Sequence, residues 1–499
     1  MKKTNSFLFT SLVIASLLLT ACGGGGGANT TLTPGLGTDG TAAVPSTAST
    51  ATMATGGETG TAPTATTGAA GGEATGTPAS GAATGTPAGS GAQPVVVVEL
   101  PADCGTVQLN YWNPFTGPDG PFMGELVDAF NGEFPNIQVT MNSQSDYYTQ
   151  LTTAAASDTL PDVAIVHADQ VATQAFRNVL RPIDDMVTQI GVTGSDFPAA
   201  VWEAGEVAGK RYSIPLDIHP MTMFYNADLM EKMGITEPPM TREDFEAAAK
   251  AMTADGNFGF MITTGFPVQQ IFQQLLHQYG GSEFNEDGTE VTWNSEAGVQ
   301  ALTWMKQAQD QYSEANLEVD AELNSFKSGN VGMIWNGIWQ ITNVTGDAVE
   351  FNGMATSIPQ IGTEMAVWAG SHQLTLPVHA SGVDQCKDTA SGIFIQYLLN
   401  NSITWSQAGQ IPASNAVRES AEFQDLHPQV DIGQSVENAF FPPSVPGIGD
   451  AFAPLGEAVA SVLSGEATDI QATLDSAAER ATEILQQNQK NYGDAPSNP

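Results

Sequence analysis

Two prolines bracket an aspartate and a histidine near the middle of the chain, in the order Pro215, Asp217, His219 and Pro220. Proline fixes its own φ angle and biases the preceding residue toward extended backbone. We therefore expect this segment to be an ordered strand that holds both polar side chains on stiff backbone, an arrangement suited to a ligand cleft. The alternative is a buried strand that has Asp217 and His219 at the protein surface, where neither side chain binds a ligand.

Further candidates follow predicted strands. Alternating or continuous apolar runs predict strands over 107–112, 136–141 and 161–166, and helical periodicity predicts helices over 121–134 and 146–156. This order implies parallel strands joined by right-handed crossovers. Ligands of such sheets bind beyond the carboxyl ends of the strands. The candidate ligand-binding residues at these ends are Trp112, Gln144, His167 and Asp169.

Two later segments combine tryptophan with polar residues. A predicted strand over 331–335 leads through Gly337 to a second tryptophan, and a Trp-Ala-Gly-Ser-His-Gln run precedes a strand predicted over 374–378. Tryptophan faces suit the apolar face of a sugar ring, and amides or imidazoles pair with hydroxyls. The candidates here are Trp335, Trp339, Trp368, His372 and Gln373. The alternative for the first two tryptophans is a place in the hydrophobic core.

The composition is strongly acidic. The 499 residues include 15 Lys and Arg against 54 Asp and Glu, a formal net charge of −39. Nucleic acids and anionic membrane surfaces are bound by clustered Lys and Arg, so we expect neither as a partner. A neutral or cationic ligand is favoured. We expect no metal and no cofactor, because no established motif for either is present.

The N-terminus has the features of a targeting segment. Lys2 and Lys3 precede an apolar run, 7–19, that is too short to span a bilayer as a helix. The following Leu-Thr-Ala-Cys resembles the bacterial lipobox. We predict a lipoprotein signal peptide over 1–21 and lipidation, including palmitate, at Cys22. An ordinary secretory signal is the alternative.

Residues 22–98 are almost wholly Gly, Ala, Thr, Ser and Pro. Such a segment cannot bury enough apolar surface to fold, so we predict a disordered tether. A flexible chain of this length has a root-mean-square reach of about 45–50 Å. Residues 491–499 are predicted to form a short tail.

The remaining cysteines are Cys104 and Cys386. In an oxidising compartment they are able to form a disulfide. Two separate buried thiols are the alternative.

The chain from Val107 to about Lys490 resembles the family 1 extracellular solute-binding proteins of carbohydrate ABC transporters, the family that includes maltose-binding protein. The resemblance rests on the order and spacing of several segments, namely Tyr111-Trp112, Pro161-Asp162-Val163, 209–226, 326–339 and Ile411-Pro412-Ala413.

This resemblance implies a two-lobed α/β fold of the type II periplasmic-binding-protein class, with a hinge and a ligand cleft between the lobes. Lobe one would comprise 104–216 plus 374–430, and lobe two 217–373 plus 431–490. Both Cys104 and Cys386 would then lie in lobe one, which favours the disulfide. The implied protein is a monomer that captures a sugar and delivers it to the permease subunits.

Two other functions fit the composition. One is a receptor for a polyamine or another small polar solute. The other is a secreted carbohydrate-active enzyme, which would need two carboxylates about 5–10 Å apart across a cleft. The sequence has no nucleophile elbow, no His-Glu-x-x-His and no phosphate loop. We therefore expect a binding protein rather than an enzyme.

Overall fold

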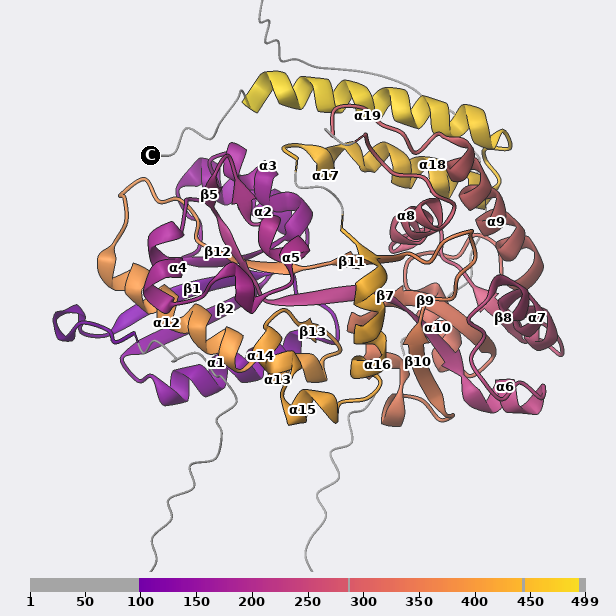
Figure 1. Ribbon diagram of the computed structural model, residues 1–499, viewed down its shortest axis with the longest axis horizontal. Helices are drawn as coiled ribbons and strands as arrows, with labels where there is room; N and C mark the ends of the chain where they lie inside the picture. Colours follow the sequence, from indigo (N-terminus) through magenta and orange to yellow (C-terminus); the bar gives the residue numbers. More distant parts are fainter. Residues whose placement is uncertain (1–97, 286–287, 442–444, 493–499) are drawn as a thin grey trace, which may run out of the picture. The chain divides into compact units, whose positions relative to one another are not determined.

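The structure is a computed structural model that describes residues 98–285, 288–441 and 445–492. The predicted signal peptide, Cys22, nearly all of the predicted tether and most of the predicted tail lie outside these residues. The described residues belong to one compact unit of the chain. Two mixed β-sheets with helices packed against them form its frame (Figure 1).

The first sheet has the strand order β2-β1-β3-β12-β6. Its strands are β1 (Val107–Asn113), β2 (Ile137–Ser143), β3 (Val163–His167), β6 (Ser213–Pro215) and β12 (His372–Thr375). β1 runs parallel to β2 and β3, which confirms the three predicted parallel strands, and β12 runs antiparallel to β3 and β6.

Alternating burial along β1 explains how this sheet acquires its core. Leu109 and Tyr111 are buried, and they join Phe130 of α1 (Gly120–Glu133) and Phe394 of α12 (Gln385–Asn400) in one apolar cluster. The Tyr111 and Phe130 rings both meet Phe394 edge-on, at centroid distances of 5.3 Å and 5.0 Å. These contacts hold α1 and α12 against the first sheet.

The second sheet has the order β14-β11-β7-β9-β8, and β10 and β13 also pair with β7. Its strands are β7 (Asp217–Asn226), β8 (Phe258–Met261), β9 (Val331–Gly337), β10 (Gly353–Ser357), β11 (Val367–Gly370), β13 (Ile411–Pro412) and β14 (Ala439–Phe440). A separate small hairpin pairs β4 (Glu206–Val207) with β5 (Lys210–Arg211).

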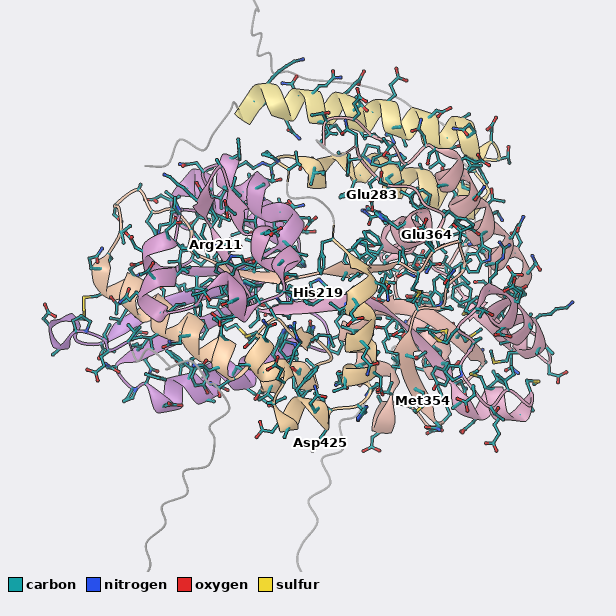
Figure 2. All side chains as sticks on the ribbon, in the orientation of Figure 1. Arg211, His219, Glu283, Met354, Glu364 and Asp425 are labelled. Atoms are coloured by element: carbon teal, nitrogen blue, oxygen red, sulfur yellow. A yellow bond between two sulfur atoms is a disulfide. The ribbon has the colours of Figure 1, made fainter. Side chains whose placement is uncertain are left out.

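Strand β7 connects the two sheets. The backbone N–H of Leu216, just before β7, donates to the carbonyl of His372 in the first sheet at 2.8 Å. Further along, Met223 of β7 pairs with Trp335 of β9 in the second sheet. The ordered strand predicted between the prolines is confirmed, and all its residues except Tyr225 are buried. Figure 2 shows His219 in the interior, between the strands of the two sheets.

The other helices cover the sheets and their ends. Around the first sheet lie α2 (Tyr147–Ser157), α3 (Val171–Phe176), α4 (Asp184–Ile190), α5 (Ala199–Glu203) and α13 (Ser402–Gln407). The later helices are α6 (Ala227–Lys232), α7 (Arg242–Met252), α8 (Val268–Gln278), α9 (Glu296–Tyr312), α10 (Ala321–Lys327), α11 (Ile341–Val344), α14 (Asn415–Arg418), α15 (Ala421–Gln424), α16 (Gln429–Gly433), α17 (Ile448–Ala451), α18 (Ala453–Ser464) and α19 (Ile470–Tyr492). Within the described ranges, no helix combines the length and apolar character needed to cross a bilayer.

One predicted boundary is wrong. The strand predicted over 374–378 begins at His372, which pairs with His167 of β3, and Trp368 lies in β11 rather than in a loop. The polar run at 371–373 was expected to precede the strand, but its side chains are satisfied inside the sheet. Gln373, for example, accepts from the Ser213 hydroxyl at 2.8 Å. His372 and Gln373 consequently belong to the first sheet, outside the segment expected for lobe one.

Cys104 and Cys386 are joined by a disulfide, with their Cα atoms 5.5 Å apart. Cys104 ends the short 3-10 helix Ala102–Cys104, and Cys386 lies in the first turn of α12. The bond therefore ties the start of the described chain to a helix of the first sheet.

Candidate functional site: a ligand cavity

A cavity of about 450 Å³ opens where strands of both sheets end or cross. Its walls come from the loop after β1, the end of β3, strand β7, strands β11 and β12, and the start of α8. This is the edge at which the sequence predicts ligand binding.

Aromatic rings form one wall of the cavity. Trp339 and Phe266 are stacked, with ring centroids 5.8 Å apart and planes inclined by 27°, and Trp368 also lines the space. Phe266 is 52% exposed, unusual for a large apolar side chain beside a cavity. A β-carbon at Gly337 would lie 1.9 Å from the Trp339 ring, so glycine lets the indole lie against the backbone.

Neutral polar atoms without protein partners lie in the same wall. The indole Nε1 of Trp368 and the carbonyl Oε1 of Gln270 are buried, and neither has a hydrogen-bond partner within the described residues. A buried polar group without a partner costs about 1–3 kcal/mol. One is a donor and the other an acceptor, and both side chains line the cavity, so a turn of either side chain toward a bound ligand would bring its polar atom to a hydroxyl group.

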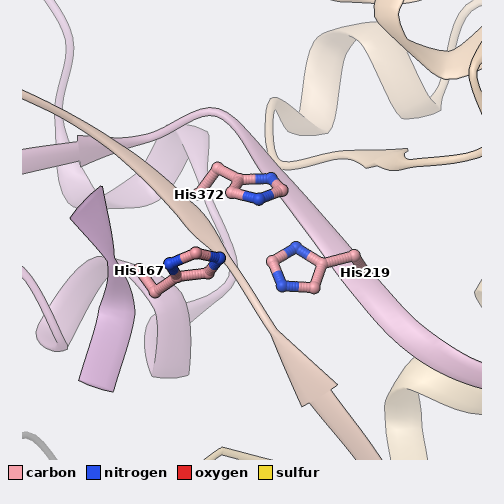
Figure 3. Close-up of side chains that lie close together, drawn as sticks. All are labelled: His167, His219 and His372. Carbon is pink, nitrogen blue, oxygen red and sulfur yellow. The ribbon is translucent and has the colours of Figure 1, made fainter. Parts of the chain in front are cut away.

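Three histidines converge beside this wall, and Figure 3 shows their rings close together. His167 ends β3, His219 lies in β7 and His372 begins β12. Their ring centroids are 5.0 Å apart for His167 and His372, 4.2 Å for His219 and His372, and 5.9 Å for His167 and His219. All three side chains line the cavity.

Asp217 holds two of these rings from behind. Its carboxylate accepts from Nδ1 of His219 at 3.1 Å and from Nδ1 of His372 at 2.7 Å. The Trp405 indole N–H also donates to it at 2.6 Å, and so does the His372 backbone N–H at 3.0 Å. Because an ionised carboxylate only accepts, both Nδ1 atoms carry a proton. Each ring is thus fixed in orientation and tautomer.

Burial shifts the pKa values of the titratable groups in this site. Burial alone would raise the pKa of Asp217, but the neighbouring His372 and His219 lower it well below its usual range. Burial lowers the pKa of His372 and, more strongly, of His167, and the other imidazoles add to the latter shift. Both rings are therefore neutral near pH 7.

Two carboxyl groups face the cavity. Burial raises the pKa of Asp119 to about 6, although Gln410 donates a hydrogen bond to it at 3.1 Å. Burial also raises the pKa of Asp169, which follows β3. No Lys or Arg is among the residues that line the cavity.

Six of the predicted binding residues line the cavity, namely His167, Asp169, His219, Trp339, Trp368 and His372. The other five lie elsewhere. Asp217 is fully buried behind the histidines, and Gln373 is fully buried with its Nε2 donating to the Val201 carbonyl and the Ser371 hydroxyl. Both side chains support the wall without reaching the cavity.

The remaining three are Trp112 and Gln144, predicted from their places at strand ends, and Trp335, predicted from the strand and turn that contain it. Trp335 is 1% exposed and stacks on Trp304, at 5.5 Å between centroids, inside the second apolar core. Trp112 packs against the core cluster beneath α2, and Gln144 follows β2 beside the Asn113 carbonyl. Neither lines the cavity.

Sequence reasoning missed several lining residues, namely Phe115, Asp119, Tyr148, Phe266, Gln270 and Phe441. Two signals were available. Asp119 immediately precedes the Gly-Pro start of α1, and Phe266 immediately precedes the proline before α8. Side chains at helix starts beside parallel strand ends commonly face the ligand.

A second cavity, of about 440 Å³, lies beside the first turn of α12. Four of its charged side chains are already paired, Lys387 with Asp162 at 2.9 Å and Arg181 with Asp388. Because it offers no Trp, Tyr or Phe surface, it is the weaker candidate for a sugar site.

Residues 115–378 match the family of bacterial extracellular solute-binding proteins. This match extends over more than half of the chain. The chain belongs to this family. Its members are binding proteins that act outside the cytoplasm, and the cavity lies largely within the matched residues.

Relatives and solved structures agree with this assignment. The maltotriose-binding protein of Pyrococcus abyssi is 22% identical over 379 residues, 75% of this chain and 81% of that protein. The structure of an ABC substrate-binding protein from Listeria monocytogenes in complex with cycloalternan has a TM-score of 0.67 and 22% identity, covering 76% of this chain and 99% of that one. UgpB from Mycobacterium tuberculosis in complex with glycerophosphocholine has a TM-score of 0.67 and 18% identity, covering 77% and 99%. The fold is that of the two-lobed, type II binding proteins.

Proposed function

We propose that this solute-binding protein captures a neutral mono- or oligosaccharide in the 450 Å³ cavity and delivers it to the permease of an ABC importer. The observation that carries the proposal is the pairing of a partly exposed aromatic wall with unpartnered neutral polar atoms. Trp339 and Phe266 offer stacking surfaces, and Trp368 Nε1 and Gln270 Oε1 offer a donor and an acceptor. Sugar rings have an apolar face and hydroxyls that donate and accept at once.

The charge of the lining further narrows the ligand class. A phosphorylated sugar would be expected to meet Lys or Arg, and none lines the cavity. The maltotriose-binding relative and the structural neighbour with bound cycloalternan support a saccharide. The neighbour with bound glycerophosphocholine indicates that this fold also accommodates other solutes.

The affinity required is within reach of these groups. Micromolar binding corresponds to about 8 kcal/mol. A few stacked rings and roughly six to ten hydrogen bonds, at about 1 kcal/mol net each, would supply it on closure of the cleft. We infer that lobe one (104–216 plus 374–430) and lobe two (217–373 plus 431–490) close around the sugar by a hinge.

The anchoring of the protein is part of the same proposal. Cleavage after residue 21 would leave Cys22 with lipid, palmitate included, and residues 22–98 would tether a monomeric binding body to the membrane surface. Metabolic labelling with a palmitate analogue tests this directly. We expect label in the wild-type chain and none in Cys22→Ala.

A thermal-shift screen followed by calorimetry tests the sugar. Mono- and oligosaccharides, spermidine and a glycerophosphodiester are added to the full chain in the presence of a metal chelator. We expect one or more neutral sugars to raise the melting temperature and to bind with one-to-one stoichiometry. Hydrolysis of an added oligosaccharide, or stabilisation by spermidine alone, would contradict the proposal.

A polyamine is the second candidate, because the described lining residues include two carboxyl groups, Asp119 and Asp169, and no Lys or Arg. The pKa of Asp119 is about 6, so polyamine binding would strengthen as pH rises through 6. Sugar binding should depend on this pH range much more weakly, because a carboxyl group accepts from a hydroxyl group in either protonation state. Calorimetry at two pH values on either side therefore separates the two ligands.

A further inference from the structure

The histidine cluster has the composition and spacing of a metal site. One ring nitrogen from each of His167, His219 and His372 lies within 4.8 Å of the others. Neutral imidazole is a favoured ligand of Zn²⁺, Cu²⁺ and Ni²⁺. Hydrogen bonding to a hydroxyl group does not need three imidazoles grouped on one side of a cavity.

The residues behind the rings match the surroundings of known metal-binding histidines. Such a histidine almost always uses its second nitrogen for a hydrogen bond to a carboxylate, a carbonyl or another oxygen. Here the Asp217 carboxylate accepts from Nδ1 of His219 and of His372, and the Tyr148 hydroxyl lies 2.6 Å from Nδ1 of His167. With Nδ1 of His219 and His372 donating to Asp217, Nε2 is the nitrogen left for an ion in these two rings; in His167 it is left when Nδ1 donates to the Tyr148 hydroxyl.

We propose that His167, His219 and His372 together bind one divalent transition-metal ion, with Zn²⁺ as the reference ion, at the wall of the ligand cavity. Zinc–nitrogen bonds of about 2.0–2.1 Å place the ligands of a tetrahedral site roughly 3.4 Å apart. Small inward shifts of the rings from their present spacing reach this geometry. The negative charge of Asp217 offsets part of the charge of the ion.

Three protein ligands leave a coordination position that faces the cavity. The cavity holds two carboxyl groups, from Asp119 and Asp169, and no Lys or Arg, so its charge also favours a cation. The ion would act as a fixed Lewis acid beside the Trp339 ring, which lies 5.8 Å from the His219 ring between centroids. The metal site stands on these residues and does not depend on the identity of the sugar.

Metal binding is tested on the full chain after treatment with a chelator and dialysis. Calorimetric titration with ZnCl₂ near neutral pH is expected to give one equivalent per chain. Alanine at any one of His167, His219 and His372 should weaken binding by more than about 100-fold, and Asp217→Asn by about 10–100-fold. His427→Ala is the matched control, because His427 is exposed, pairs with Asp431 and lies outside the histidine cluster. It should leave the affinity unchanged.

A spectroscopic measurement on the wild-type chain keeps the proposal testable if a variant fails to fold. Cu²⁺-loaded protein should show electron paramagnetic resonance splitting from imidazole nitrogens, and preloading with a large excess of Zn²⁺ should reduce this signal by competition, since Cu²⁺ binds such sites more tightly than Zn²⁺. Absence of saturable binding of Zn²⁺, Cu²⁺, Ni²⁺ and Co²⁺ would overturn the proposal. Equal affinity in His219→Ala and His427→Ala would overturn it as well. Because the sugar screen is run with chelator, failure of either proposal leaves the other intact.

Discussion

A β-carbon at Gly370 would lie 2.2 Å from Nε2 of His219. The two residues are directly paired between β11 and β7, and the Nε2 side of the imidazole lies close to the glycine backbone. The absence of a side chain at Gly370 therefore makes room for the His219 ring. Any larger residue at position 370 would have to displace His219.

We expect Gly370→Ala to weaken both Zn²⁺ and sugar binding by at least about tenfold, because the displaced ring would leave the histidine cluster. Calorimetry with each ligand provides the measurement. Gly132→Ala is the control, since a β-carbon there meets nothing within 4 Å. Unchanged binding in Gly370→Ala would mean that His219 is not part of the site.

Trp339 and Trp335 are expected to serve different purposes, the first in sugar binding and the second in folding stability. Trp339→Ala should weaken sugar binding by roughly tenfold or more with a modest effect on folding, because its indole lines the cavity and stacks on Phe266. Trp335→Ala should instead lower the free energy of unfolding by about 3–5 kcal/mol, because its ring is 1% exposed in the core. Urea unfolding and calorimetry on both variants distinguish these roles. The reverse pattern would contradict the assignment.

The disulfide should carry a substantial part of the stability. Cys104 and Cys386 are separated by 282 residues, so the bond restricts a long loop in the unfolded chain. The double variant Cys104→Ala/Cys386→Ala is expected to lose about 2–5 kcal/mol of unfolding free energy. Reductant should lower the stability of the wild type to the same level and leave the variant unaffected. Two free thiols in secreted wild-type protein, detected by mass spectrometry, would contradict the bond.

The sequence was sufficient to predict the elements and their order where local patterns are strong. Strands β1, β2 and β3 follow from apolar alternation, and the extended start of β7 follows from Pro215 and Pro220. From strand order alone, the ligand site was expected at the carboxyl ends of the parallel strands, and His167 and Asp169 do line the cavity there.

The roles of individual side chains depend on packing that local patterns do not contain. Asp217 and His219 are two residues apart on the same strand, yet only His219 lines the cavity. The carboxylate of Asp217 is instead occupied by His372 and Trp405, which are 155 and 188 residues away in the sequence. Those long-range hydrogen bonds decide which side chain meets the ligand.

A buried carboxyl group outside the cavity gives the chain a pH-dependent stability. Glu322 of α10 is 1% exposed; Asn336 donates to its Oε1 at 3.1 Å, and Oε2 has no partner among the described residues. Burial raises its pKa from 4.5 to about 7. The folded state therefore binds this proton more tightly than the unfolded state does.

Stability from this group is fully present below pH 4.5 and is lost as pH rises through about 7. The loss amounts to about 3 kcal/mol, at 1.36 kcal/mol per unit of pKa. Glu322→Gln removes this titration. Between pH 5 and 8, measured by urea unfolding, the wild type should therefore lose roughly 2.5 kcal/mol more unfolding free energy than Glu322→Gln does. Any constant cost of burying the amide N–H shifts the whole curve without changing its slope. Glu314→Gln, at an exposed position, is the control and should follow the wild-type slope. Parallel curves for the wild type and Glu322→Gln would show that the Glu322 carboxyl ionises without penalty in the folded protein.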